Sequence, residues 1–88
     1  MKKRLTKSLY SPEWEACCIV LKDLREANGI TQTDLSTRLG MPQSFVSKVE
    51  SGQRKLDLRQ FSIYVRSMGE DPIEVFSKLL SAMDEAST

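Results

Sequence analysis

The stretch "PQSFVSKVESG", residues 42–52, carries the side chains of this chain that are best suited to reading a hydrogen-bonding surface. On a helix, with about 100° between neighbours, its polar side chains share one side: Gln43, Ser44, Ser47 and Lys48. Its large apolar side chains share the other side: Phe45, Val46 and Val49. A Gln amide can bond adenine with two hydrogen bonds, a Lys can reach guanine, and a Ser can bond base edges or a phosphate. The polar side therefore predicts a helix that lies in the major groove of duplex DNA.

A solvated amphipathic helix is the simplest alternative for this stretch, and two features count against it. The polar side has no ion pair at four-residue spacing, unlike the charged faces that serve solubility. A short helix at about residues 32–39 and a tight corner at residues 40–42 also precede it. A short helix, a turn with glycine and a second helix form the helix-turn-helix unit, in which the second helix points its N-terminal end at the bases. Gln43 and Ser44 fall at that end.

Capping residues and helical periodicity predict five helices. Ser11 followed by Pro12 opens the first, because Ser is a preferred N-cap and Pro fits the first helical position. Thr31 opens the second, with Asp34 at capping-box spacing. The third is expected at about residues 43–51, the fourth between residues 57 and 69, and the fifth from residue 71 to residue 83. No stretch alternates polar and β-branched residues between turns, so we expect an all-α fold.

The 88 residues are enough for one small domain. We expect that domain at residues 11–83, between a flexible basic arm at residues 1–10 and a short acidic tail at residues 84–88. Basic residues dominate the arm and the segment 43–69, whereas acidic residues dominate the segment 70–88. This segregation suggests one region that faces anions. The arm either follows a phosphate strand or enters a minor groove, or else it is a solvated tail.

Cysteine and histidine usage argues against metal sites and catalysis. The chain has no His, and Cys17 and Cys18 are adjacent rather than spaced for a metal ion. We interpret both as small hydrophobic residues of a reduced, cytoplasmic protein. No nucleophile and base can be assembled, so we expect no enzyme, no cofactor and no metal. The longest apolar run, "ACCIVL", is too short to span a bilayer, and no apolar signal-peptide region follows the basic arm.

The segment "LREANGITQTDLSTRLGMPQSFVSKVESGQRKLDLRQFSIYVRSMGEDP" resembles the lambdoid phage Cro and repressor family, the Xre-type helix-turn-helix. The features that match are "TQTDL", the "LG" corner, "QSFVSKVESG" and the amphipathic helix that follows. The resemblance implies a lambda-repressor-like domain of four or five helices that binds DNA and regulates transcription, and with the helices predicted above we expect five. By position it implies base reading by the polar side of residues 43–51. It also implies phosphate contacts from a second set: Gln32, Ser51, Gln53, Arg54 and Lys55.

Glu50 lies at the border between the two sides of the 43–51 helix. A partly buried carboxylate there needs a bidentate partner. In the family that this sequence resembles, an acidic residue at the position of Glu50 pairs with an arginine late in the first helix. The matching arginine here is Arg25. We therefore predict an Arg25–Glu50 salt bridge, and the resemblance adds Gln32 as a brace for the same helix.

Two residues depart from the family pattern. Pro42 replaces the polar N-cap that often precedes the recognition helix, so one helix-end N–H is expected to lose its side-chain acceptor. Phe45 stands where many members have a smaller or polar residue. It either covers the edge of the core or touches a thymine methyl.

The fifth expected helix has a wider apolar arc than core packing requires. Its apolar residues span nearly half of the circumference, whereas a core-facing stripe needs only ~100° or somewhat more. The surplus predicts a homodimer contact on the outer part of the helix, through Val75, Leu79 and Met83. A fully packed terminal helix in a monomer is the alternative. A two-fold dimer suits half-sites one DNA turn apart, which predicts an operator with an inverted repeat.

These features together predict a cytoplasmic, nucleoid-associated regulator of transcription, most simply a repressor, that inserts residues 43–51 in the major groove of double-stranded DNA. The alternative is an antitoxin that binds a protein partner and its own promoter, with the fifth helix and the acidic tail facing that partner. A helical adaptor that binds no DNA is the weaker rival, because it leaves the polar side of residues 43–51 without a use.

Overall fold

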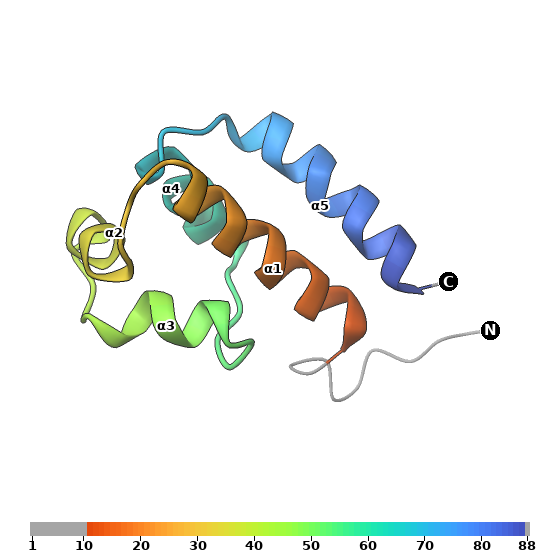
Figure 1. The fold of residues 1–88 in the computed structure, drawn as a ribbon, viewed down its shortest axis with the longest axis horizontal. Coiled ribbons are helices and arrows are strands. Elements are labelled where there is room, and N and C mark those ends of the chain that lie inside the picture. Colours follow the sequence, from red (N-terminus) through yellow and green to blue (C-terminus); the bar gives the residue numbers. More distant parts are fainter. Residues whose placement is uncertain (1–10, 88) are drawn as a thin grey trace.

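The computed structural model describes residues 11–87, so Thr88 and the expected basic arm at residues 1–10 lie outside the described part. The described chain forms α1 (Pro12–Ala27), α2 (Gln32–Leu39), α3 (Ser44–Glu50), α4 (Leu58–Ser67) and α5 (Pro72–Ser87) (Figure 1). Between residues 11 and 87 there is no strand, and none of these helices is long and apolar enough to cross a membrane. The domain is therefore all-α.

Side-chain caps set where α1, α2 and α4 begin. Ser11 Oγ accepts the backbone N–H of Trp14 at 3.1 Å. Thr31 and Asp34 form a reciprocal capping box at the start of α2. The start of α4 has a second capping box, formed by Asp57 and Gln60. Each cap satisfies a backbone N–H that the helix itself leaves unpaired, so these helices begin where the local sequence dictates.

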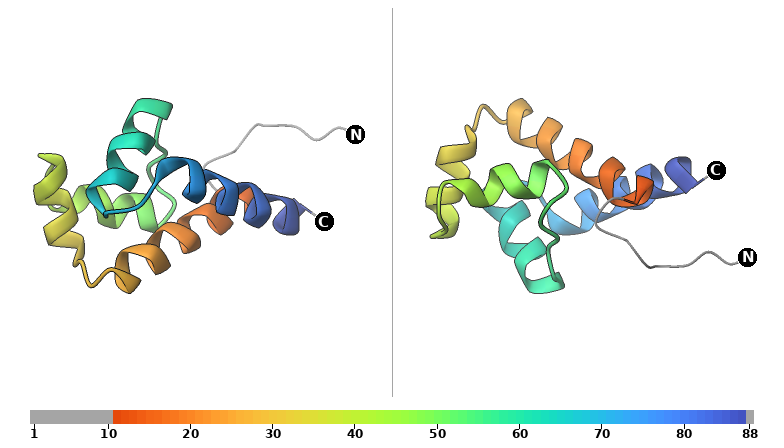
Figure 2. Two further views of the ribbon diagram at one scale, coloured as in Figure 1. Left: turned by 90° about the horizontal axis from the view of Figure 1, so that it is seen from above. Right: turned by 90° about the horizontal axis from the view of Figure 1, so that it is seen from below.

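The core lies between α1 and α5, which run alongside each other, and the three shorter helices (Figures 1 and 2). Its largest fully buried apolar side chains come from all five helices: Tyr64, Leu21, Leu35, Met68, Val46, Val49, Val65 and Val75. The α2–α3 pair lies at the opposite end of the molecule from the C-terminal end of α5 (Figure 2). The core thus supports α3 from behind and leaves its other side open.

The rotation of α5 differs from the sequence expectation. Val75 and Leu79, expected in an outward dimer contact, are buried in the core at 0% and 5% exposure, and Met83 is half-buried. The exposed large apolar side chains of α5 are instead Ile73, Phe76 and Leu80. A helical wheel gives the width of an apolar arc, but packing against the neighbouring helices, here mainly α1, decides which part of the arc faces inward.

The end of α5 also differs from the expectation, because the helix continues to Ser87. Most of the expected acidic tail, residues 84–88, is therefore helical. No Gly or Pro follows Met83, so the sequence contains no residue that stops the helix there. The exposed Asp84 and Glu85 extend the solvent-facing side of α5.

Candidate nucleic-acid interface

A glycine in the left-handed conformation ends α2 and directs the chain into α3. Gly40 has a φ of 68°, and a Cβ added there would meet nothing within 4 Å. The backbone conformation, rather than a lack of space, therefore requires glycine. The backbone N–H of Met41 donates to the Ser36 carbonyl at 3.0 Å, which closes the end of α2. The chain then passes through the short connection between α2 and α3 (Figure 1).

The two sides of α3 have different environments. The apolar side is buried, with exposures of 8% for Phe45 and 0% for both Val46 and Val49. The polar side is exposed along its whole length: Gln43, Ser44, Ser47 and Lys48. Gln43, Ser44 and Ser47 line an open hollow together with Gln32 and Thr33 of α2. The side chains expected to read bases thus lie on one accessible surface.

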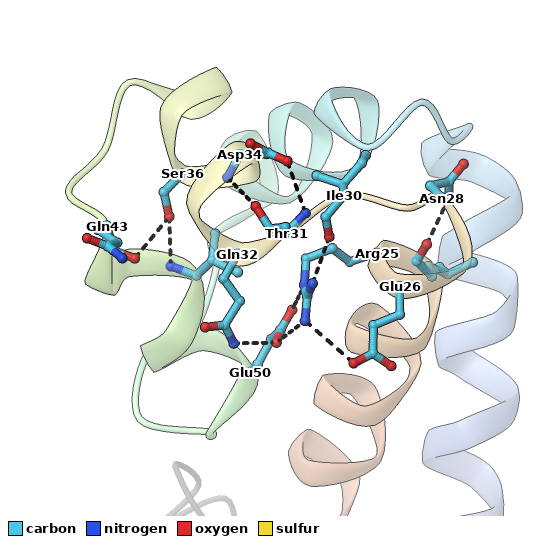
Figure 3. A network of polar contacts seen from close by, with 12 residues as sticks. Arg25, Glu26, Asn28, Ile30, Thr31, Gln32, Asp34, Ser36, Gln43 and Glu50 are labelled. Carbon is cyan, nitrogen blue, oxygen red and sulfur yellow. Dashed lines mark hydrogen bonds and ion pairs between the residues drawn. The ribbon is translucent and has the colours of Figure 1, made fainter.

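Ser36 of α2 supplies the side-chain cap of α3, whose N-cap position is Gln43 rather than the expected Pro42. Gln43 stands at the N-cap position of α3 and makes no side-chain cap hydrogen bond. The Ser36 hydroxyl, 1% exposed, accepts the backbone N–H of Val46 at 3.4 Å and donates to the Gln43 carbonyl at 3.2 Å (Figure 3). The expected loss of an acceptor is therefore made good by a residue of the preceding helix.

The expected Arg25–Glu50 ion pair is present and joins α1 to the end of α3 (Figure 3). Arg25 Nε donates to Glu50 Oε2 at 2.6 Å, and Arg25 Nη2 donates to Glu50 Oε1 at 3.1 Å. The third guanidinium nitrogen, Nη1, donates to the Ile30 carbonyl at 2.7 Å. Hydrogen bonding to Glu50 raises the pKa of the Arg25 guanidinium above its ordinary value, although burial opposes this. The pair is bidentate and removed from solvent, with side-chain exposures of 8% and 4%.

Side chains at the start of α2 contact both ends of α3. Gln32 Nε2 donates to Glu50 Oε1 at 2.8 Å (Figure 3). Gln43 Nε2 donates to Thr33 Oγ1 at 3.1 Å. Because Gln32 is half-buried and bonded to Glu50, it braces α3.

Phe45 packs against the core edge and beneath a basic side chain. Its ring centroid lies 6.4 Å from that of Tyr64, in a tilted arrangement. The guanidinium carbon of Arg54 lies 5.2 Å from the Phe45 centroid, within the range of a cation–π contact. Burial and these two contacts account for an aromatic residue at this position, and they hold Arg54 next to α3.

The segment after α3 contains four of the five expected phosphate-contacting residues, since Gln32 lies at the start of α2. The backbone N–H groups of Gln53 and Arg54 donate to the Lys48 carbonyl at 2.9 and 3.1 Å. The Ser51 hydroxyl donates to the same carbonyl at 3.2 Å. Ser51, Gln53 and Arg54 are exposed, whereas Lys55 is half-buried. The fold therefore brings this set together at the C-terminal end of α3.

Known proteins share both the sequence pattern and this geometry. The helix-turn-helix family model matches residues 21–75. A solved structure of an XRE-family like protein from Pseudomonas syringae pv. tomato str. DC3000 is 42% identical, covers 90% of this chain and 96% of its own, and superposes with a TM-score of 0.77. The chain belongs to the Xre family of helix-turn-helix proteins.

Two other solved structures share the fold of this Xre-family protein at lower identity. The restriction-modification controller protein C.Esp1396I is 20% identical, with 81% of this chain and 93% of that chain covered and a TM-score of 0.72. The clp gene regulator ClgR from Corynebacterium glutamicum is 17% identical, with 85% and 80% covered and a TM-score of 0.75. C.Esp1396I has also been solved as a tetramer in complex with its natural 35 base-pair operator. No curated protein matches the chain.

Family membership identifies the Xre-family protein as a DNA-binding regulator of transcription rather than an enzyme. Three residues near α3 were not among those singled out from the sequence: Lys22, Thr33 and Ser36. Lys22 of α1 lines a hollow with Gln32, Ser47 and Ser51, which adds an exposed cation beside the polar side. No local pattern marks Lys22, because only the packing of α1 on α3 brings it there. For Thr33 and Ser36 the sequence offered one signal. Their spacing of three residues puts both hydroxyls on the same side of α2, where they can face the next helix.

Proposed function

We propose that the protein binds duplex DNA in a sequence-specific manner with α3 in the major groove, and that it represses transcription by occupying its operator. One observation carries the proposal. The exposed side of α3 consists of base-compatible polar side chains, while the opposite side is buried and tied to α1 and α2. A rigid helix that presents such side chains suits direct reading of base edges. We propose that the protein is cytoplasmic and associates with the nucleoid by binding this DNA.

Within this proposal, specificity and affinity come from different residues. Gln43, Ser44, Ser47 and Lys48 read base edges in the groove. The phosphate contacts come from residues around α3: Gln32, Ser51, Gln53, Arg54 and Lys55. Support for this division comes from the positions of the two sets, since the first covers the open side of α3 and most of the second follows its C-terminal end. Phosphate contacts act on every sequence alike through counterion release.

We further propose a homodimer that binds an inverted repeat, with a revised contact surface. The exposed apolar side chains of α5 are Ile73, Phe76 and Leu80. On α4 the exposed Leu58 lines a hollow together with Phe76. Phe76 also contacts Phe61 of α4, with ring centroids 6.1 Å apart, so the two helices contribute to one surface. Apolar patches shared between neighbouring helices mark protein–protein contacts.

Selection from random duplex DNA, followed by a salt titration on the selected site, tests the function. We expect an inverted repeat, with an affinity that falls steeply as salt rises. Gln43→Ala should relax the base preference at one position in each half-site. Arg54→Ala should weaken binding to all sequences and flatten the salt slope by about one unit. Lys78→Ala, an exposed cation of α5, is the matched control and should change neither quantity. The assignment is wrong if no sequence is enriched, or if both test variants bind the selected site like the wild-type protein.

A further inference from the structure

Gln43 is held by two hydroxyl groups of α2. Its side-chain Nε2 donates to Thr33 Oγ1 at 3.1 Å, and its backbone carbonyl accepts from Ser36 Oγ at 3.2 Å. Thr33 and Ser36 are one turn apart, so both hydroxyls lie on the side of α2 that faces the start of α3. Figure 3 shows Ser36 and Gln43 facing each other across the two helices. Gln43 is therefore fixed through both its main chain and its side chain, although it is exposed.

The Thr33 contact changes what the Gln43 amide can offer to a base. A Gln amide has two N–H donors and one carbonyl acceptor. Donation of one N–H to Thr33 leaves one N–H and the carbonyl. In the major groove adenine presents the N7 acceptor beside the N6 amino donor, whereas guanine presents two acceptors, N7 and O6. The amide held by Thr33 matches adenine, and it cannot give both N–H groups to guanine.

We propose that Thr33 is a specificity-determining positioning residue, which holds the Gln43 amide so that it reads adenine rather than guanine. The proposal rests on the proposed function, because it assigns a base to one of the side chains that read the operator. Ser36 fixes the position of the Gln43 backbone through its carbonyl, and Thr33 fixes the orientation of the Gln43 side-chain amide. The neighbouring Gln32 serves a different residue, since its Nε2 donates to Glu50.

Matched variants of Thr33 test this role on the selected operator. Thr33→Val removes the hydroxyl with little change of shape, and Thr33→Ser keeps the hydroxyl. The base pair read by Gln43 is identified as the one whose preference Gln43→Ala removes, and we expect it to be A·T. There Thr33→Val should reduce the preference for adenine over guanine roughly three- to tenfold, the range of one hydrogen bond. Thr33→Ser should stay within about twofold of wild type.

Two further measurements separate positioning from a general loss of binding. Thr33→Val should leave the salt slope and the affinity for non-specific DNA unchanged, since Thr33 touches no phosphate in this proposal. In the Gln43→Ala background Thr33→Val should have no further effect, because coupled residues are not additive. Without DNA, 15N relaxation of the Gln43 side-chain amide should show greater mobility in Thr33→Val and not in Thr33→Ser.

The outcomes distinguish this proposal from the function on which it rests. A wild-type protein that selects no sequence overturns both. If the operator is selected but Thr33→Val keeps the full adenine preference, only the role of Thr33 is overturned. The same holds if the base pair read by Gln43 is G·C, or if Thr33→Val weakens binding to all sequences equally.

Discussion

At the scale of single residues, Arg25 is a buried cation whose guanidinium nitrogens all donate hydrogen bonds. Its three guanidinium nitrogens bond Glu50 and the Ile30 carbonyl, so one side chain connects α1, the loop before α2 and the end of α3. Both charged groups are almost fully removed from solvent. A buried pair of this kind adds little net stability compared with an apolar pair, but the loss of one partner leaves a buried charge without compensation.

Arg25→Met should therefore lower the free energy of unfolding by about 3 kcal/mol, because it leaves the buried Glu50 carboxylate without its cationic partner and with the Gln32 amide as its remaining hydrogen-bond donor. Equilibrium unfolding in urea, followed by circular dichroism, measures the change. Arg59→Met is the control, because Arg59 is exposed on α4 and its replacement should cost less than about 0.5 kcal/mol. If the two variants unfold at the same urea concentration, the ion pair does not have the structural role given to it here.

The two cysteines behave as buried apolar residues at this scale. Cys17 and Cys18 are 3% and 2% exposed and unpaired. Burial, assisted by the nearby Cys17 and by the Glu15 and Glu50 carboxylates, raises the pKa of the Cys18 thiol to about 11.

Both thiols should react slowly with Ellman's reagent while the protein is folded. With a pKa near 11 the reactive thiolate of Cys18 makes up only ~0.1% of the population at pH 8, against roughly a quarter for an ordinary thiol. Labelling should therefore be at least ~100-fold slower than for a free cysteine and should become fast in denaturant. Fast labelling of the native protein at pH 8 would contradict this account of the α1 core.

At the scale of elements, α3 depends on its neighbours for its existence. It covers only Ser44–Glu50, which is too short for a stable isolated helix. Ser36 of α2 caps its first turn, its own Phe45 packs against Tyr64 of α4, and its last residue, Glu50, bonds Arg25 of α1. The solvent-facing side chains of α3 are therefore not needed to stabilise this helix.

Ser36→Ala should lower the free energy of unfolding by about 1 kcal/mol, the usual value of a lost N-cap. It should also speed hydrogen exchange of the Val46 amide, which loses its side-chain acceptor. Thr37→Ala removes an exposed hydroxyl from the next position of α2 and serves as the control. Unchanged Val46 exchange in Ser36→Ala would show that the start of α3 does not depend on this contact.

At the scale of the whole molecule, the apolar surface of α4 and α5 lies mostly on α5, and α1 lies between α5 and α3 in the view of Figure 1. Its exposed members include Leu80 at 45% and Leu58 at 85%. This arrangement leaves room for a second copy to bind there without covering the side chains proposed to read bases. Ile19 of α1, 61% exposed, gives a comparison residue outside this surface.

Leu80→Glu should convert the proposed dimer into a folded monomer, because a charge would have to be buried in the apolar contact. Analytical ultracentrifugation measures the mass, and circular dichroism checks the fold. Affinity for a complete inverted repeat should fall roughly 100-fold or more, the avidity of linked sites, while half-site affinity stays unchanged. Ile19→Glu should remain dimeric. A wild-type monomer at all concentrations, or a dimeric Leu80→Glu protein, would rule out this surface as the dimer contact.

The local sequence was a good guide to the helix starts and to the ends of α1 to α4, but a poor guide to the end and the rotation of α5. Ser11, Thr31 and Asp57 cap helices through residues three positions away, so the relevant contacts lie within one turn. Val75 and Leu79 were misplaced because the wheel of α5 alone cannot say which part of a wide apolar arc meets α1. The continuation of α5 to Ser87 was missed because no residue after Met83 signals a stop.

The sequence by itself determined the all-α class, the helix-turn-helix pairing, the two sides of residues 43–51 and the Xre-type resemblance, because periodicity, caps and motif spacing are short-range properties. Only the tertiary structure decided how the start of α3 is completed after Pro42, since its acceptor, Ser36, comes from another helix. Only the tertiary structure placed Arg54 over Phe45 and tied the Gln43 amide to Thr33. These contacts depend on the angle and distance at which helices pack, and many side chains along the chain set that geometry together.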